Sequence, residues 1–335
     1  MQYLYTLAST RSDSYYEQFL LSITSLKARM PNAFITLLCD THTKADLTGN
    51  RREYEKIVSN IITAEVPSSL TQVEISRWIK TSMRRLVKGD FLFIDCDTII
   101  TDDLSSIFSS NLVFAACLDK HSILDNHNKK HMIIKNDNKL GFSSYMSNKH
   151  FNSGVIYCAD TPQTHTAFDR WHELWLYSKD KNILRDQPSF NMAIQENISH
   201  FTELNGTWNC QIAYNGLPYL SNARIIHYFA TDMIFNESPY LLSCNYILMQ
   251  IKEKGIIPDE AFDLLKEPKT AFTPHSQILA GDDMLYVINS SLFQFIFILR
   301  KKMPSIFNIF NRLCAALKRP VKNKYIKKNK KNIYN

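Results

Sequence analysis

Glycine is scarce in this chain, with only 8 among 335 residues. Tight phosphate-binding loops need glycine because the backbone must approach the ligand closely. The sequence contains neither the GxGxxG motif of dinucleotide-binding folds nor the GxxxxGK[ST] motif of P-loop proteins. The sequence therefore argues against both of these nucleotide-binding classes.

Paired cysteines are also lacking. Seven cysteines are spread from Cys39 to Cys314 without a CxxC pair, so neither a zinc site nor a disulfide framework is indicated. We expect reduced, mostly buried thiols, as in a cytosolic protein. The first ten residues, MQYLYTLAST, lack the basic start and long apolar core of a signal peptide, and we expect them to contain the first strand.

Acidic residues are absent beyond Asp283. Residues 284–335 carry twelve Lys and Arg, whereas residues 1–283 carry 27 basic and 32 acidic residues. The net charge of +7 is therefore the sum of a mildly acidic body and a strongly basic tail. Such an asymmetry predicts an anionic partner for the tail.

Short apolar runs alternate with amphipathic stretches through the first 230 residues. This alternation is typical of an α/β fold, in which helices connect the strands of a sheet by right-handed crossovers. We expect helices around residues 16–26, 74–87, 104–108 and 168–177, from 186 onward, and irregularly over 236–275. The expected strands are 3–7, 34–39, 57–66, 91–94, 111–118, 151–158 and 223–227. Residues 121–148 are polar, and we expect them to form a mobile loop or lid.

The functional prediction centres on FLFIDCDT, residues 91–98. Four apolar residues indicate a buried strand, and Asp95 and Asp97 follow at its carboxyl end, where open α/β sheets bind ligands. Because side chains two apart on a strand face the same way, both carboxylates are expected to converge on one divalent cation. Oxygen donors with open positions suit Mg²⁺ or Mn²⁺ held together with substrate phosphates. A capped strand end is the plainer alternative.

Four segments then follow one another in a distinctive order: FLFIDCD, FNSGVIYC, DQPSFN and IIHYF. In this order the chain resembles the GT-A glycosyltransferases, most closely glycosyltransferase family 8 and its bacterial relatives, over roughly residues 1–230. The resemblance implies a GT-A fold, the Rossmann-like mixed sheet flanked by helices of nucleotide-diphospho-sugar transferases, here with a helical C-terminal extension. It also implies a hexosyltransferase that uses a nucleotide sugar, most simply a UDP-sugar, and retains the anomeric configuration.

The same resemblance implies roles for individual residues. Asp95, Asp97 and His227 would bind Mn²⁺ or Mg²⁺, which neutralises charge on the leaving nucleoside diphosphate. Asp186 and Gln187 would lie at the reacting carbon, although a front-side mechanism needs no protein nucleophile, and an inverting enzyme would need a carboxylate base instead. Donor and acceptor would be bound by Ala8, Ser9, Thr10, Arg77, Lys80, Asp119, Asn152 and Ser153.

Several plainer or rival interpretations stay open from the sequence. His227 alone fits a buried structural histidine, and Lys80 fits a solvated helix face. FIDCDT also resembles the first motif of haloacid-dehalogenase-type phosphatases, with Asp95 as nucleophile, Asp97 as acid/base and residues 281–283 (Gly-Asp-Asp) as a second acidic motif. A non-enzymatic sugar- or nucleotide-binding module is a further alternative.

The tail combines apolar and basic residues. Met284–Leu299 is mostly apolar but shorter than the ~20 residues that a membrane-spanning helix needs. Beyond it, apolar residues recur at helical spacing among Lys and Arg, and Lys322–Lys331 forms a basic end. An amphipathic basic helix suits the surface of an anionic membrane. A helix packed on the body is the alternative, and nucleic acid is not expected because no motif supports it.

These observations predict three parts: a catalytic domain at 1–235, a helical extension at 236–283 and a membrane-associating tail at 284–335. We expect a cytoplasmic enzyme that is peripheral on the inner face of the cell membrane. A saccharide or glycolipid acceptor, in the synthesis of a lipid-linked surface glycan such as lipopolysaccharide or capsule, would suit that location.

Overall fold

The computed structural model describes residues 1–212, 214–228, 242, 245–272 and 290–316. The chain divides into two compact units, residues 1–273 and 274–335. The predicted domain boundaries at 235 and 283 lie outside the described residues, as do the acidic segment 281–283 and the basic end at 322–331. The three-part division therefore stays a prediction.

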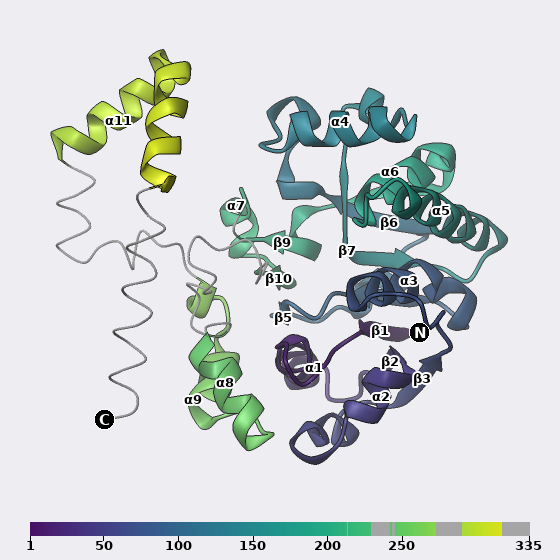
Figure 1. The fold of residues 1–335 in the computed structure, drawn as a ribbon. Coiled ribbons are helices and arrows are strands. Elements are labelled where there is room, and N and C mark those ends of the chain that lie inside the picture. Colours follow the sequence, from purple (N-terminus) through teal and green to yellow (C-terminus); the bar gives the residue numbers. More distant parts are fainter. Residues whose placement is uncertain (213, 229–241, 243–244, 273–289, 317–335) are drawn as a thin grey trace. The chain divides into compact units, whose positions relative to one another are not determined.

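A mixed sheet forms the centre of the first unit (Figure 1). Its described strands follow the spatial order β3-β2-β1-β4-β7-β6-β8. The first four lie parallel to one another, whereas β7 runs antiparallel to both β4 and β6, and β8 runs parallel to β6. The strands are β1 (Gln2–Leu7), β2 (Ile35–Asp40), β3 (Asn60–Ala64), β4 (Phe91–Ile94), β6 (Phe114–Leu118), β7 (Phe151–Cys158) and β8 (Phe201–Leu204).

A smaller sheet has the order β5-β10-β9, with β5 (Thr98–Ile100), β9 (Cys210–Gln211) and β10 (Ile225–His227). Strand β10 runs antiparallel to β5 and parallel to β9. Because β5 follows β4 after only three residues, this sheet continues directly from the centre of the main sheet. The predicted α/β class with a mixed sheet is confirmed.

Helices connect the strands and cover the sheet. The α-helices of the first unit are α1 (Tyr15–Arg29), α2 (Thr41–Asp46), α3 (Gln72–Leu86), α4 (Lys130–Leu140), α5 (Pro162–Asp180), α6 (Gln187–Glu196), α7 (Leu217–Leu220), α8 (Asn245–Lys254) and α9 (Asp259–Lys266). Short 3₁₀ helices are η1 (Gly49–Arg51), η2 (Glu53–Lys56), η3 (Ser105–Ser109), η4 (Asp119–His121), η5 (Leu124–Asn126), η6 (Ser144–Ser147), η7 (Ile198–His200), η8 (Gly206–Asn209) and η10 (Thr270–Phe272).

Local sequence explains where two of the long helices, α3 and α5, begin. Helix α3 starts at a capping box, in which the Thr71 hydroxyl accepts from the Glu74 backbone N–H and the Glu74 carboxylate accepts from the Thr71 backbone N–H. Helix α5 starts at a second capping box on Thr161 and has Pro162 in its first turn, where a missing N–H costs nothing.

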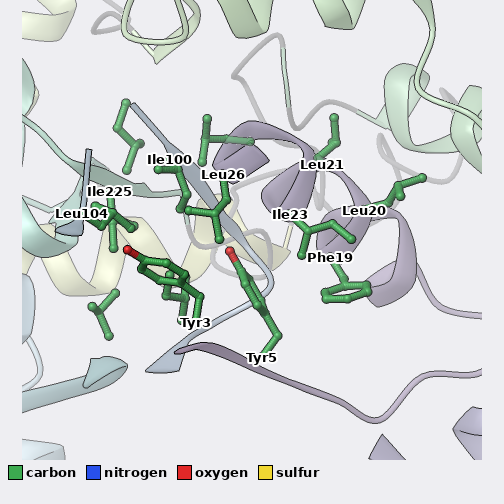
Figure 2. Close-up of a cluster of buried hydrophobic side chains, with 14 of the residues drawn as sticks. Tyr3, Tyr5, Phe19, Leu20, Leu21, Ile23, Leu26, Ile100, Leu104 and Ile225 are labelled. Carbon is green, nitrogen blue, oxygen red and sulfur yellow. The ribbon is translucent and has the colours of Figure 1, made fainter. Parts of the chain in front are cut away.

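The first of two cores lies between the main sheet and α1. Side chains of β1 alternate, so that Tyr3 and Tyr5 point into this core, whereas Leu4 points to the opposite face. Figure 2 shows Tyr3, Tyr5 and Phe19 of α1 in this cluster, and the Tyr5 and Phe19 rings meet edge to face with centroids 5.5 Å apart. Ile100 of β5 belongs to the same cluster, so that the smaller sheet shares this core.

The second core lies on the other face, under α3, α5 and α6. Figure 1 shows α5 and α6 side by side. Trp171 of α5 and Phe190 of α6 pack with ring centroids 4.7 Å apart. The Trp171 indole N–H also donates to the backbone carbonyl of Asp186 at 3.2 Å, so this core fixes the start of α6.

The later helices of the first unit pack on the first core, to which Ile247 and Ile251 of α8 and Leu265 of α9 contribute. Polar contacts join the same elements: the Arg29 guanidinium donates to the carbonyl of Leu265 at 3.0 Å, and Lys252 donates to the carbonyl of Asp13 at 2.8 Å. The described part of the predicted helical stretch 236–275 therefore adds to the body of the fold.

The prediction of a mobile loop or lid at 121–148 is wrong. The segment contains η5, α4 and η6, and Ile133, Leu140 and Phe142 are all buried. Gly141 ends α4 in the left-handed conformation (φ 70°), and the buried Asp137 accepts a hydrogen bond from Ser144. A few apolar anchors at helical spacing were hidden by the many Asn and Lys around them.

The described part of the second unit is helical: α11 (Ser291–Lys302) is followed by helical residues 304–316. Large apolar side chains along both stretches are exposed, among them Phe295, Phe297 and Phe310 at 57–61%. Among the described residues, no helix combines the length and apolar character needed to cross a bilayer.

We expect Phe19→Ala to lower the free energy of unfolding by about 3–5 kcal/mol, because Phe19 is fully buried and its removal leaves a cavity. Phe34→Ala is the matched control, since Phe34 is 49% exposed, and its effect should stay within about 0.5 kcal/mol. Urea unfolding followed by circular dichroism measures both. Equal effects of the two substitutions would contradict the assignment of this core.

Candidate active site

Strand directions bring the predicted site residues to one edge of the main sheet. Strands β1, β4 and β6 point the same way, so that Ala8, Asp95 and Asp119 follow their carboxyl ends at a common edge. Strand β7 is antiparallel to its neighbours and therefore begins at that edge, with Asn152 and Ser153. One edge thus collects residues from four separate parts of the chain.

The connection between β4 and β5 positions the two acids. The Asp95 backbone N–H donates to the Gly154 carbonyl at 2.8 Å, which extends the pairing of β4 with β7 by one residue. The Thr98 hydroxyl donates to the Asp95 carbonyl at 2.8 Å and closes the turn. Both the Asp95 and Asp97 side chains remain partly accessible at the end of the strand.

Strand β10 brings His227 to these acids from more than a hundred residues away. In the β5–β10 register His227 lies opposite Thr98, and the backbone N–H of Tyr228 donates to the Asp97 carbonyl at 3.2 Å. The His227 Nε2 atom consequently lies 3.1 Å from Asp97 Oδ1.

The three side chains fit a divalent cation. One donor atom each from Asp95, Asp97 and His227 lie within 4.8 Å of one another, close to the ~4 Å span across an ion with bonds of about 2.1 Å. Two carboxylate oxygens and one imidazole nitrogen suit Mn²⁺ or Mg²⁺. Gly154 makes room for the histidine: a Cβ at this position would lie 2.4 Å from His227 Cε1.

Electrostatics at the cluster also favour an additional positive charge. Burial raises the pKa of Asp95, against the opposing pull of Lys80. Burial also opposes the charged forms of Asp97 and His227, but their mutual attraction prevails, so that the pKa of Asp97 is lowered and that of His227 is raised. A cation at this position would stabilise both carboxylates, and at His227 Nε2 it would replace a proton.

Lys80 is a buried cation, with a side chain only 4% exposed. Its ammonium donates to both oxygens of Asp95 at 3.0 and 3.1 Å and lies 3.8 Å from Asp186 Oδ2. It also faces the ring of Phe93 at 5.0 Å. The alternative that Lys80 lies on a solvated helix face is therefore wrong, because Lys80 lies on the face of the amphipathic helix α3 that is directed toward the site.

Asp186 lies where α3, β7 and α6 meet. Its carboxylate forms an ion pair with Arg77 at 3.2 Å and accepts a hydrogen bond from the Ser153 hydroxyl at 2.8 Å. Burial raises the pKa of Asp186, but the charges of Lys80 and Arg77 and the Ser153 hydrogen bond outweigh it, so that the pKa lies below its ordinary value. Asp186 is thus an ionised carboxylate held by two cations.

Asp119 is the centre of a second buried network. Its oxygens accept hydrogen bonds from His127 Nε2 and from Asn152 Nδ2, both at 2.9 Å. Burial opposes ionisation, but these contacts together with His150 lower the pKa of Asp119 to about 2. The His127 Nδ1 atom accepts from the Lys129 backbone N–H at 3.0 Å, so the proton of this imidazole is on Nε2 and points at Asp119.

Two clefts flank these charges. The first, of about 200 Å³, contains Asp95, Asp97, Arg77, Lys80 and Ala8 together with Thr6, Leu7, Tyr15, Gln18, Gln72, Val73, Ser76 and Cys96. Ser9 and Thr10 do not line it, because the Ser9 backbone N–H donates to Thr43 and that of Thr10 donates to Asp13. Of the three residues predicted after β1, Ala8 alone lines this cleft.

The second cleft, of about 230 Å³, is lined by the predicted residues Arg77, Asp119, Asn152, Asp186 and Gln187. Helix α4 and its surroundings complete it with Lys120, His127, Lys129, Met132, Ile133, Asn136, His150, Arg185 and Pro188. Arg77 lines both clefts, and it forms an ion pair with Asp186, which lines the second cleft. The two clefts therefore share a charged boundary.

The profile of glycosyl transferase family 8 matches residues 8–232, about two thirds of the chain. The chain belongs to glycosyltransferase family 8. It is therefore a glycosyltransferase, and the predicted family is confirmed. No curated protein sequence matches this family member.

Solved glycosyltransferases share the fold of this family 8 chain. The bifunctional glycosyltransferase WbbM is 15% identical with a TM-score of 0.50, over 79% of this chain and 51% of that one. The galactosyltransferase LgtC, in complex with donor and acceptor sugar analogs, is 13% identical with a TM-score of 0.48, over 78% and 99%. GlyE of Streptococcus pneumoniae TIGR4 is 16% identical with a TM-score of 0.48, over 82% and 66%. The predicted GT-A fold is confirmed.

Sequence reasoning missed three contributors to this glycosyltransferase site. Tyr15 lines the first cleft from the start of α1, and His127 orients Asp119 from a segment expected to be a loop. Asn209 contacts both His227 and Asn152, although Trp208-Asn209 belongs to none of the four motifs. The only sequence signal for His127 and Asn209 is the placement of a polar residue beside short apolar runs.

We expect Gly154→Ala to weaken Mn²⁺ binding by tenfold or more, because the new methyl group would displace the His227 ring. Isothermal titration calorimetry measures the affinity, and thermal unfolding reports whether the variant is folded. Cys158→Ala, at the far end of the same strand, is the control and should leave Mn²⁺ affinity unchanged. Equal affinities of the parent and Gly154→Ala would show that His227 is not a ligand.

Proposed function

We propose that this glycosyltransferase moves a hexose-type sugar from a UDP-sugar to a saccharide acceptor, with Mn²⁺ or Mg²⁺ bound by Asp95, Asp97 and His227. The observation that carries the proposal is the convergence of these three donors beside the first cleft, which Asp95 and Asp97 line. Membership of family 8 supports a nucleotide-sugar donor and a saccharide acceptor.

In this proposal the first cleft binds the nucleoside diphosphate. The exposed Tyr15 ring and the apolar side chains of Ala8 and Val73 offer a surface on which a base stacks. Arg77 lines the same cleft and supplies a positive charge for the diphosphate. When bound, the cation would neutralise charge on the leaving nucleoside diphosphate.

The second cleft then binds the transferred sugar. Each Asp119 oxygen accepts one hydrogen bond from the protein and retains a lone pair for a sugar hydroxyl. Because the pKa of Asp119 is about 2, it is a full anion at neutral pH and a strong acceptor. The predicted substrate role of Asn152 and Ser153 then becomes one of positioning Asp119 and Asp186 beside the sugar.

The surroundings of Asp186 favour retention by a front-side mechanism. Its carboxylate is already neutralised by Lys80 and Arg77 and accepts a hydrogen bond from Ser153, which makes it a weak nucleophile. Gln187 is half-buried and lines the second cleft, so that its amide contacts the sugar. Asp186 and Gln187 thus hold the reacting carbon while the acceptor hydroxyl attacks from the side of the leaving diphosphate.

The phosphatase alternative receives no support. The chain has a family 8 profile over residues 8–232 instead.

We further propose that the second unit attaches the enzyme to the inner face of an anionic membrane, where a lipid-linked glycan precursor is the acceptor. Exposed Phe and Ile side chains of α11 lie beside the exposed cations Arg300, Lys301 and Lys302. Apolar side chains enter the interfacial region, and each basic residue near an anionic surface contributes about 1 kcal/mol. The absence of acidic residues beyond Asp283 removes the repulsion that would oppose docking.

We expect Asp97→Ala to lower turnover on the order of 10²–10³-fold or more, because the variant loses a metal ligand at the leaving group. Release of nucleoside diphosphate from a panel of nucleotide sugars, with and without Mn²⁺, measures the effect. Asp180→Ala, at an exposed residue that lines neither cleft, is the control. Full activity of Asp97→Ala, or metal-dependent phosphate release from simple phosphomonoesters, would refute the proposed reaction.

Deletion of residues 285–335 should release the protein from vesicles that contain phosphatidylserine, yet leave activity on soluble acceptors. The double variant Phe295→Asp/Phe297→Asp should show the same loss in sedimentation with vesicles, because it places charges on the exposed apolar surface. Phe262→Asp is the matched control, since Phe262 is equally apolar and 49% exposed in the first unit. Unchanged sedimentation of the deletion variant would defeat the attachment.

A further inference from the structure

An unbroken chain of side-chain hydrogen bonds runs from the metal cluster to the sugar cleft through two buried amides. His227 Nδ1 lies 3.0 Å from Asn209 Oδ1, and Asn209 Nδ2 donates to Asn152 Oδ1 at 2.9 Å. Asn152 Nδ2 in turn donates to Asp119 at 2.9 Å. Asn209 is fully buried, and His227, Asn152 and Asp119 are no more than 6% exposed.

A backbone group fixes the direction of this chain. Asn152 Oδ1 accepts from the Gly154 backbone N–H at 2.9 Å, so this end of the Asn152 amide must be its oxygen. The group of Asn209 that faces it must then be the NH₂, and the Asn209 oxygen must face His227. His227 Nδ1 therefore carries a proton, because only an N–H satisfies that oxygen.

The other ring nitrogen of His227, Nε2, is directed at Asp97 of the metal cluster. With Nδ1–H donated to Asn209, the lone pair available to a cation is on Nε2. Metal-binding histidines commonly donate their other ring N–H to an oxygen acceptor, and loss of that acceptor typically weakens metal affinity 10–100-fold. Because Asn209 is fully buried, water cannot readily take its place.

We propose that Asn209 is a positioning residue that fixes the tautomer and ring orientation of His227 and couples the metal site to Asp119 in the sugar cleft. The inference rests on the proposed metal-dependent function and adds to it a residue outside the four family motifs. At the far end of the chain, His127 holds Asp119 through a tautomer set by the Lys129 backbone N–H. Backbone N–H groups thus fix the chain at Asn152, in its middle, and at His127, at this end.

Two substitutions of Asn209 separate its two contacts. Asn209→Leu removes the acceptor for His227 and the donor to Asn152 while it keeps the branched shape of the side chain and its number of heavy atoms. Asn209→Asp keeps an oxygen opposite His227, and it replaces the donor to Asn152 by a second, negatively charged oxygen. We expect the Mn²⁺ dissociation constant, measured by electron paramagnetic resonance of free Mn²⁺ without any sugar, to rise 10–100-fold in Asn209→Leu and to stay within about threefold of the parent in Asn209→Asp.

Asn191→Leu is the matched control, because Asn191 is also a buried asparagine that contacts β7, through the backbone of Phe151, but lies outside the chain. It should lower the thermal midpoint and leave Mn²⁺ affinity unchanged. Thermal unfolding of every variant separates folding from binding. If Asn209→Leu does not fold, the smaller Asn209→Ser replaces it and should weaken Mn²⁺ binding in the same direction.

A nitrogen NMR spectrum of the Mg²⁺-loaded protein gives an independent readout, with His227 identified by its loss in His227→Gln. A protonated Nδ1 supports the inference, and a protonated Nε2 overturns it. Equal Mn²⁺ affinity in the parent and Asn209→Leu would overturn the positioning role and leave the proposed function intact. A folded parent that binds no Mn²⁺ would overturn both.

Discussion

Charge compensation at one edge of the main sheet is the constraint on which the rest of the structure depends. Four carboxylates are gathered there: those of Asp119 and Asp186 are buried, where an unpaired ion would cost several kcal/mol, and those of Asp95 and Asp97 are partly accessible. Lys80 and Arg77, both of α3, and the imidazoles of His227 and His127, from two other parts of the chain, meet them. The fold succeeds only if helices and strands bring these partners to within about 3 Å.

Two features of the topology achieve this. The reversal of β7 places its first residues, rather than its last, beside the ends of β4 and β6, so that Asn152 and Ser153 reach Asp119 and Asp186. The small sheet of β5, β9 and β10 brings His227 back to the residue that follows Asp97. Packing in the two cores holds the surrounding elements in place. The second core fixes the start of α6 through Trp171, and the first core includes Ile100 of β5, in the small sheet.

Much of this arrangement follows from the sequence, and the exceptions have physical reasons. The run Phe91–Ile94 with two acids after it predicts a strand end that gathers charge, because continuous apolar runs and short-range spacing are local properties. The association of His227 with Asp97 came only from the resemblance to a family, since strand pairing across more than a hundred residues leaves no local trace. Asn209 and His127 were missed because their roles depend on tautomer and amide direction, which are set by backbone groups in the folded state. Ser9 and Thr10 do not line the first cleft, and their backbone N–H groups donate to the side chains of Thr43 and Asp13 instead.

The connection between β6 and β7 has an evolutionary consequence. Helix α4 contributes Met132, Ile133 and Asn136 to the wall of the second cleft, yet none of these residues belongs to the cation cluster or to the ion pairs of α3. Its own anchors, such as Leu140 and Phe142, belong to the apolar second core. Substitutions on this wall can therefore accumulate and change which substrate is preferred, while the reaction chemistry on the opposite side stays intact. Divergence among enzymes with this architecture would then be concentrated in α4 rather than in the rest of the β6–β7 connection, which carries Asp119 and His127.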